Sequence, residues 1–315
     1  MIPFHPTDKS LFFTKNDPDD PRVGELIESC RSLETLSEAN GFAVLGYSDD
    51  EGIALNGGRI GASEAPDTIR RFLYRMTPPS AANNKAYDLG NLLTEGSLAE
   101  RHARALQVME QLQRKSLRTI SFGGGHDYGY PDCAGFVRAH LDQKPLVINF
   151  DAHLDVRPSD KGLNSGTPFY RLLSEFGRNF QFVEVGLQPQ CNSLRHRQWA
   201  LSQGASLFDL NCVENRESLL SILESEPFRQ LTSQTPVYIS FDIDGLKSAE
   251  APGCSQSWAT GLATSDYLAF FHELKKKCAL RGLGIYEVSP PLDTGHITSK
   301  TAALIAYHFL FQDQL

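Results

Sequence analysis

The sequence predicts an α/β fold in which a parallel β-sheet carries helices on both of its faces. Short apolar runs alternate along the chain with helical patterns, and such alternation is typical of a parallel sheet. Several runs are continuously apolar, as expected for strands that are covered on both sides. The runs that we expect to form strands span residues 42–46, 86–89, 118–122, 145–150, 180–185, 206–209, 236–241 and 283–288.

Helices are expected between these strands. Ser97 and Glu100 have the spacing of a capping box and open an amphipathic stretch that ends near Lys115. A helical pattern over residues 23–40 is followed by Gly41, a typical helix stop. Two further helices are expected over residues 264–280 and 298–311.

One domain is expected over residues 21–315, because the chain has no shift in composition, no charge run and no internal repeat. Residues 1–20 contain three prolines and the run Asp-Pro-Asp-Asp. We expect this segment to be a loosely attached N-terminal extension.

Composition excludes several classes of function. The net charge of −8 disfavours a nucleic-acid partner, which usually requires a basic excess. No apolar run approaches the ~18 residues of a membrane-spanning helix, and residues 1–10 lack the apolar centre of a signal peptide. We therefore expect a cytoplasmic protein with a small-molecule substrate and no membrane partner.

The cysteines contain no Cys-x-x-Cys pair, which is typical of free thiols in a reducing compartment. They are Cys30, Cys133, Cys191, Cys212, Cys254 and Cys278. Cys254 stands in a loop that should border the site described next, and an exposed thiol there would be open to oxidation that blocks access.

Metal-ligand residues directly follow three of the expected strands, in the motifs Gly-Gly-Gly-His-Asp, Asp-Ala-His-Leu-Asp and Asp-Ile-Asp. Ligands of open α/β sheets bind beyond the carboxyl ends of the strands, so these motifs should meet there. Extended chain would direct alternate residues of one motif to the same side. The candidate ligands are His126, Asp151, His153, Asp155, Asp242 and Asp244.

The charge of this set indicates a two-metal site. Each motif alone is compatible with a tight turn or a surface loop, but the three together would place about four negative charges in one cleft. Two divalent cations would neutralise that charge, and the carboxylates could bridge ions ~3.5–4 Å apart. A ligand set richer in oxygen than in nitrogen favours a hard ion such as Mn²⁺.

These motifs, in this order, resemble the arginase–agmatinase (ureohydrolase) family. The resemblance covers about residues 40–310 and includes Asn56-Gly57-Gly58-Arg59, Ser240-Phe241-Asp242, Ala251-Pro252-Gly253 and Glu287-Val288-Ser289-Pro290. It implies a three-layer α/β/α sandwich around an eight-stranded parallel sheet, and a homo-oligomer that is a trimer or hexamer. It also implies two Mn²⁺ per subunit. One ion would be held by His126, Asp151, Asp155 and Asp242, and the other by Asp151, His153, Asp242 and Asp244.

The stretch Asp155-Val156-Arg157 followed by Ser165-Gly166-Thr167-Pro168-Phe169 resembles the formimidoylglutamase branch of this family. That branch implies hydrolysis of N-formimidoyl-L-glutamate to L-glutamate and formamide, in histidine degradation. Ser165 stands where arginases and agmatinases usually carry histidine, which disfavours those substrates. The alternatives are an agmatinase or guanidino-acid ureohydrolase that releases urea, a non-catalytic binding protein, and a deacetylase with a single zinc ion.

Roles follow from the resemblance, each with a simpler alternative. Asp155 and Asp244 would act at the ions, and Asp244 would also accept a proton. Glu287 would pair with the cationic formimino group, unless it is a surface carboxylate. Arg157 would bind a substrate carboxylate, unless it forms a structural ion pair, and Arg59 would assist unless it braces its loop. Asn164, Ser165 and Thr167 would add hydrogen bonds, unless they form a turn and helix cap before Pro168.

Overall fold

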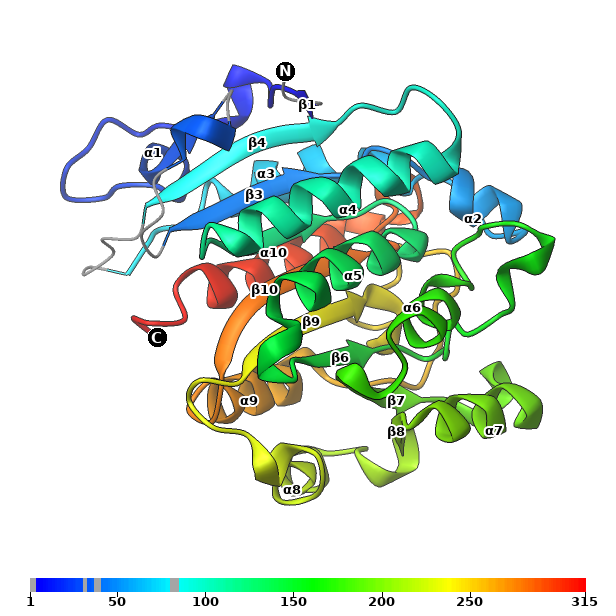
Figure 1. Cartoon of the computed structure of the whole chain (residues 1–315). Helices are drawn as coiled ribbons and strands as arrows, with labels where there is room; N and C mark the ends of the chain where they lie inside the picture. Colours follow the sequence, from blue (N-terminus) through cyan, green and yellow to red (C-terminus); the bar gives the residue numbers. More distant parts are fainter. Residues whose placement is uncertain (1–3, 31–32, 37–40, 80–84) are drawn as a thin grey trace.

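The computed structural model describes residues 4–30, 33–36, 41–79 and 85–315. Its centre is one sheet with the strand order β1-β4-β3-β5-β10-β9-β6-β7-β8, and β2 lies beside β4. The pair β1–β4 is antiparallel, and every other pair in the sheet is parallel. Figure 1 shows the twisted sheet with helices on both sides.

The elements have the following bounds. The strands are β1 (Phe4–His5), β2 (Ile27–Ser29), β3 (Phe42–Gly46), β4 (Ala86–Leu92), β5 (Arg118–Phe122), β6 (Leu146–Phe150), β7 (Gln181–Leu187), β8 (Ser206–Asp209), β9 (Pro236–Asp242) and β10 (Ala279–Tyr286). The helices are α1 (Val23–Leu26), α2 (Glu51–Leu55), α3 (Ala65–Leu73), α4 (Leu98–Arg114), α5 (Gly129–His140), α6 (Pro168–Phe176), α7 (Leu194–Gln203), α8 (Arg216–Ser221), α9 (Thr264–Leu274) and α10 (Ile297–Leu310).

Two apolar cores lie on the two faces of the sheet. Alternate residues of β6 divide between them: Ile148 and Phe150 belong to the core under α3, α8, α9 and α10, and Val147 belongs to the core under α4, α5, α6 and α7. Strands covered on both faces need apolar side chains in both directions, which explains the continuously apolar runs. The α/β prediction with helices on both faces is confirmed.

All eight expected strands occur, and the sheet has two more in the described residues. β1 and β2 are short strands from the first thirty residues, and they pair with β4. Phe4 and His5 pair with Leu92 and Asn91, so part of the segment expected to be a loose extension lies in the sheet. β10 begins at Ala279, earlier than the apolar run suggested.

Two helix predictions were wrong. The helical pattern of residues 23–40 is interrupted: α1 is followed by Ile27–Ser29, which pairs with Ala86–Asp88 of β4, because strand pairing overrides a weak local propensity. A short 3-10 helix, Leu33–Thr35, comes later in this range. The helix end expected at Gly41 is not tested, because residues 37–40 lie outside the described residues. The helix expected over 264–280 ends at Leu274, since the chain enters β10 soon afterwards.

Other helix predictions were correct. α4 begins after the capping box, in which Ser97 Oγ accepts from the Glu100 amide at 3.4 Å and Glu100 accepts from the Ser97 amide at 2.7 Å. α10 begins one residue before the expected start at Thr298. Within the described residues, no helix has the length and apolar character needed to span a membrane.

The site positions follow from the strand order. β5, β10, β9 and β6 are consecutive neighbours at the centre of the sheet and run parallel. Their carboxyl ends therefore meet at one edge. The three ligand motifs and Glu287 all follow these four strands, and this edge is where the chemistry is found.

Candidate metal centre

Two groups of metal-ligand side chains lie at this edge. The first contains His126, Asp151, Asp155 and Asp242, and the second contains Asp151, His153 and Asp244. In each group the ligand atoms lie within 4.8 Å of one another. The structure thus brings together all six residues that the sequence singled out, and Asp151 belongs to both groups.

Asp151, His153 and Asp155 converge through a turn, which differs from the extended chain that we expected. β6 ends at Phe150, and the His153 amide then donates to Asp151 Oδ1 at 2.7 Å. Asp155 has a left-handed backbone with φ of 48°. Asparagine and aspartate tolerate that conformation better than most residues, which suits the motif to the bend.

Asp242 and Asp244 are held in a similar turn at the end of β9. The Asp244 amide donates to Asp242 Oδ1 at 2.8 Å. Asp244 Oδ1 in turn accepts from the Ala152 amide at 3.3 Å, which ties this turn to the one that follows β6. The two strand ends are therefore fixed to each other by backbone donors.

His126 is delivered by the glycine turn after β5. A Cβ atom on Gly124 would lie 1.6 Å from the carbonyl oxygen of Asp49, so only glycine fits there. His126 Nε2 lies 2.9 Å from Ser240 Oγ on β9. The His126 ring also stacks on Tyr286, with 5.0 Å between the ring centroids. Sequence reasoning quoted Ser240 within its motif but gave it no role. The hydrogen bond to it leaves Nδ1 free to face the acidic cluster.

The cluster is electrostatically unusual. Burial disfavours a charged His126, but the carboxylates of Asp151, Asp155 and Asp242 outweigh this and raise its pKa well above the ordinary value. The pKa of His153 is also raised, because Asp244 and Asp151 outweigh burial.

The pKa values of the carboxylates are shifted in both directions. Burial tends to raise the pKa of Asp151, but the two imidazoles hold it below the ordinary value. Burial and neighbouring carboxylates raise the pKa of Asp155 and Asp242. Burial raises the pKa of Asp244 to about 6, against the opposing effect of His153. Raised pKa values of this kind are expected where several carboxylates share a buried site without a cation.

A metal ion fits the first group. His126 Nδ1 is buried and lies 3.1 Å from Asp151 Oδ2, 3.1 Å from Asp155 Oδ2 and 3.2 Å from Asp242 Oδ2. It makes no well-directed hydrogen bond to any side chain of the described residues. One nitrogen facing three carboxylate oxygens without a directed bond is the arrangement expected around an ion, and the oxygen-rich set suits Mn²⁺.

The second group is similar but smaller. His153 Nδ1 lies 3.3 Å from Asp151 Oδ1 and 3.1 Å from Asp244 Oδ2. Asp242 was expected to bridge both ions, but in the structure it joins only the first group. Bridging of both ions by Asp242 stays a prediction, because its Oδ1 lies in the turn that carries Asp244.

Glu287 lies beside the cluster, directly after β10. Its backbone is left-handed, with φ of 64°, and its Oε1 accepts from the His126 amide at 3.0 Å. Burial raises the pKa of Glu287 to about 8, although that amide opposes the rise. The residue is 6% exposed, so it is not the surface carboxylate of the simpler alternative.

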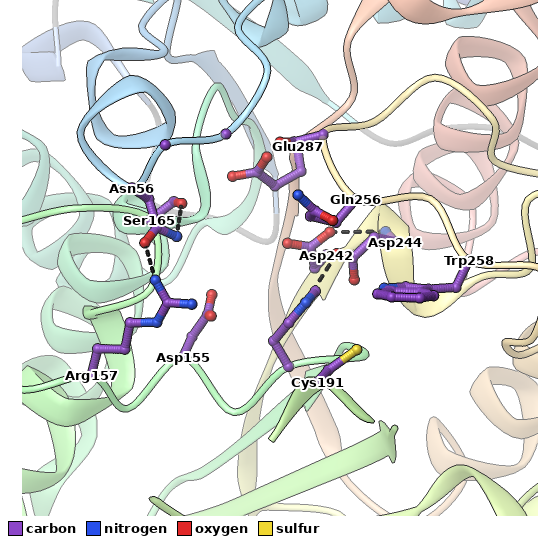
Figure 2. Close-up of a pocket in the computed structure, with 14 residues that line it drawn as sticks. Asn56, Asp155, Arg157, Ser165, Cys191, Asp242, Asp244, Gln256, Trp258 and Glu287 are labelled. Carbon is purple, nitrogen blue, oxygen red and sulfur yellow. Dashed lines mark hydrogen bonds and ion pairs between the residues drawn. The ribbon is translucent and has the colours of Figure 1, made fainter. Parts of the chain in front are cut away.

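A cavity of about 270 Å³ opens over this cluster (Figure 2). Glu287, Asp155, Asp242, Asp244 and His153 are among its lining residues. The other lining residues are Asn56, Gly57, Gly58, Arg157, Ser165, Cys191, Ser255, Gln256 and Trp258.

Arg157 and Ser165, two of the expected substrate-binding residues, lie on one wall of this cavity. They are linked by Asn56, which sequence reasoning missed as a site residue. Arg157 donates to Asn56 Oδ1, and Asn56 Nδ2 lies 3.0 Å from Ser165 Oγ. Figure 2 shows the three side chains together, beside Asp155. Asn56 and Arg157 are 101 residues apart in the chain, so no local signal could have paired them.

Three other expected substrate-binding residues are placed elsewhere. Asn164 and Thr167 bond to each other: Thr167 Oγ1 donates to the Asn164 carbonyl at 2.8 Å and accepts from its amide at 3.2 Å. This is the turn of the simpler alternative. Arg59 braces a loop, because its guanidinium donates to the carbonyls of Ser255 at 3.0 Å and Cys254 at 2.9 Å. None of the three is among the lining residues of the cavity.

The cysteine expected at the site is covered. Cys254 is fully buried, and burial raises the pKa of its thiol well above the ordinary value. The hypothesis that Cys254 is oxidised requires an exposed thiol, so it is wrong for this residue. Cys191 lines the cavity instead.

Known proteins resemble this chain in sequence. The model of the arginase family matches residues 41–312. A formimidoylglutamase of Clostridium tetani is 31% identical over 277 residues, which covers 85% of this chain and 81% of the relative.

Solved structures of formiminoglutamases have a similar fold. A crystal structure of Trypanosoma cruzi formiminoglutamase with Mn²⁺ has a TM-score of 0.81 at 29% identity, and the match covers 93% of this chain and 98% of that one. Formimidoylglutamase of Bacillus subtilis has a TM-score of 0.84 at 26% identity, with 96% and 95% of the two chains covered.

Proposed function

The chain belongs to the arginase family, and from this premise we propose that it is a manganese-dependent hydrolase of N-formimidoyl-L-glutamate. The products are L-glutamate and formamide. The observation that carries the proposal is a six-residue ligand cluster, four of whose members are buried, at a cavity that is also lined by Arg157. The similarity to formimidoylglutamases supports the same substrate.

The metal ligands have distinct tasks. His126, Asp151, Asp155 and Asp242 would hold one Mn²⁺, and Asp151, His153 and Asp244 would hold the other. Two such ions, when bound, lower the pKa of water enough to supply a hydroxide nucleophile near neutral pH.

Other groups position the substrate and move protons. Glu287 pairs with the cationic formimino nitrogen, which directs the formimino carbon toward the ligand cluster. A new C–O bond forms at that carbon and the C–N bond to glutamate breaks. The departing amine gains a proton, for which Asp244 is the proposed carrier because it lines the cavity beside the ligand cluster. Asp155 lies opposite, beside Arg157.

Arg157 would bind one substrate carboxylate. Guanidinium and carboxylate groups form strong charge-assisted hydrogen bonds. Asn56 holds the arginine side chain toward the cavity, and Ser165 supports Asn56. An arginine at the mouth would also repel agmatine, which is cationic at both ends.

The biological setting belongs to the same proposal. Removal of the formimino group yields glutamate, which places the reaction in histidine degradation. We propose a cytoplasmic location, with which the lack of a Cys-x-x-Cys pair in the sequence is consistent. A trimer or hexamer remains our proposal for the assembly.

A product assay tests the function. The full chain, loaded with Mn²⁺, is offered formimidoylglutamate, agmatine, arginine and 4-guanidinobutyrate in parallel. Formamide and glutamate from the first substrate alone support the proposal. Urea from any guanidino compound would show a ureohydrolase instead, and no product from the four would contradict the proposed substrate.

A further inference from the structure

Gln256 and Trp258 line the cavity, and the side-chain N–H groups of both are without a hydrogen bond to other described residues. Trp258 Nε1 is covered from solvent and has no hydrogen-bond partner among the described residues. A buried N–H group without a partner is uncommon in folded proteins and usually has a specific explanation. Gln256 is exposed on the same loop and lines the same cavity. Figure 2 shows both side chains beside Asp242 and Asp244.

The loop that carries these donors is firmly held, although the donors are free. Arg59 donates to the carbonyls of Cys254 and Ser255, and the Arg59 amide donates to Ser255 Oγ at 2.9 Å. Further along, the Trp258 carbonyl accepts from the Ser248 amide at 2.7 Å. Fixed backbone on both sides presents the two side chains to the cavity without a large ordering cost on binding.

The opposite wall is different. Asn56, Arg157 and Ser165 already bond to one another there, and Arg157 is the one lysine or arginine among the cavity residues of the described chain. A substrate with two carboxylates would meet one such cation. The second carboxylate needs other donors, since an unpaired buried carboxylate is strongly disfavoured.

We propose that Gln256 and Trp258 form a neutral subsite for one substrate carboxylate, while Arg157 binds the other. This inference rests on the proposed function, because it assigns the two ends of the same substrate. Neutral N–H donors suit this wall because they add no positive charge beside the metal ions. The pair would make the cavity selective for dicarboxylate amidines.

Substrate truncation combined with substitution tests the subsite. Trp258→Phe removes the N–H donor and keeps an aromatic ring. With formimidoylglutamate we expect kcat/KM to fall about 10- to 100-fold, the range for loss of a hydrogen bond to a charged group. Gln256→Met should give a smaller loss, about 3- to 10-fold, because Gln256 is exposed to water.

The truncated substrates are 4-(formimidoylamino)butyrate, which lacks the α-carboxylate, and 2-(formimidoylamino)butyrate, which lacks the distal carboxylate. The loss caused by Trp258→Phe should vanish with one of them. The loss caused by Arg157→Ala should vanish with the other. A Trp258→Phe loss that persists with both compounds, or no loss with formimidoylglutamate, would overturn the subsite.

The matched control is Trp199→Phe. Trp199 is the other of the two tryptophans and stacks on Tyr170 of α6, away from the cavity-lining residues. This variant should keep wild-type kinetics. It also leaves Trp258 as the sole indole, whose fluorescence should change when the product glutamate is titrated into the Mn²⁺-loaded protein. An unchanged spectrum at glutamate concentrations that inhibit turnover would contradict contact with Trp258.

The subsite and the proposed function fail in different ways. If wild-type protein does not hydrolyse formimidoylglutamate, the function is wrong before any variant is made. If the wild type is active but Trp258→Phe and Arg157→Ala lose sensitivity to the same carboxylate, only the assignment of Gln256 and Trp258 is wrong.

Discussion

Asp151 and Asp242 occupy matching positions at the ends of neighbouring strands. Phe150 and Phe241 are partners in the β6–β9 register, so the two aspartates follow side by side. Each accepts the amide two residues ahead through Oδ1 and directs Oδ2 toward His126 Nδ1. Two carboxylates are thereby oriented by their own backbone before any ion binds.

Asp151 and Asp242 differ in one respect, and the difference should be measurable as the number of Mn²⁺ ions that each variant binds. Asp151 belongs to both ligand groups and Asp242 to one. We expect Asp151→Ala to bind almost no Mn²⁺ and Asp242→Ala to keep about one ion per chain, with both variants at least about 10³-fold less active. Mass spectrometry of the metal after gel filtration measures this. Asp160→Asn, an exposed carboxylate away from the cluster, is the control, and equal metal loss in both test variants would contradict the asymmetry.

Ser240 should tune metal affinity without ligating. Its hydroxyl lies 2.9 Å from His126 Nε2 and fixes the ring. Ser240→Ala should weaken Mn²⁺ binding about 10- to 100-fold, the range for partners of metal-bound histidine, while saturating metal restores most of the activity. Isothermal titration with Mn²⁺ checks the affinity. Activity that stays low at saturating metal would point to a role other than positioning His126.

Arg157 and Asn56 should act as one unit. Arg157→Ala should raise KM for formimidoylglutamate about 10- to 100-fold with a smaller change in kcat. Asn56→Ala should raise KM in the same direction because it frees the arginine. The double variant should be little worse than Arg157→Ala alone, since coupled residues are not additive. Arg195→Ala, an exposed arginine on α7, is the control, and fully additive effects would show that Asn56 acts independently.

Glu287→Gln should lower kcat about 10²-fold, because the neutral amide keeps the hydrogen bond to the His126 amide but cannot balance a cationic formimino group. Steady-state kinetics at matched Mn²⁺ content measures the change. The circular dichroism spectrum and metal content should match the wild type. Wild-type kcat in this variant would remove Glu287 from the proposed mechanism.

Acid should destabilise the fold through His140. Burial, aided by Arg281, lowers the pKa of His140 to about 4, while the unfolded chain protonates near 6.5. The unfolded state therefore binds more protons between these values, and stability falls as the pH drops through this window. The free energy of unfolding should fall by about 2 kcal/mol more in the wild type than in His140→Gln between pH 7 and pH 5. Urea titrations at both pH values measure the difference, and parallel losses would contradict it.

Part of this site could be predicted because its ligands sit in short motifs that follow strands. His126, Asp151 and Asp242 could be grouped once parallel strands were expected to end at one edge. The route by which they converge could not be seen, because the left-handed backbone of Asp155 depends on the turn that surrounds it. Ser240 stands in a recognised motif, but its hydrogen bond to His126 joins β9 to the turn after β5 and has no local signal in the sequence.

Long-range contacts explain the remaining errors. Residues 27–29 carry a helical pattern and still form a strand, because β4 offers them open hydrogen-bonding groups. Gln256 and Trp258 stand in no motif, and the stretch that contains Asn56 gave that residue no role. The cavity that all three line is assembled from distant loops.

The position of β10 has a consequence for biosynthesis. This strand comes last in the chain but lies between β5 and β9, which pair with it on either side. Until residues 279–286 have left the ribosome, the halves of the sheet that bear His126 and Asp242 have no shared neighbour. Manganese binding is thus a late event in synthesis. A nascent chain that lacks this strand would expose the unpaired edges of β5 and β9, which chaperones and proteases recognise.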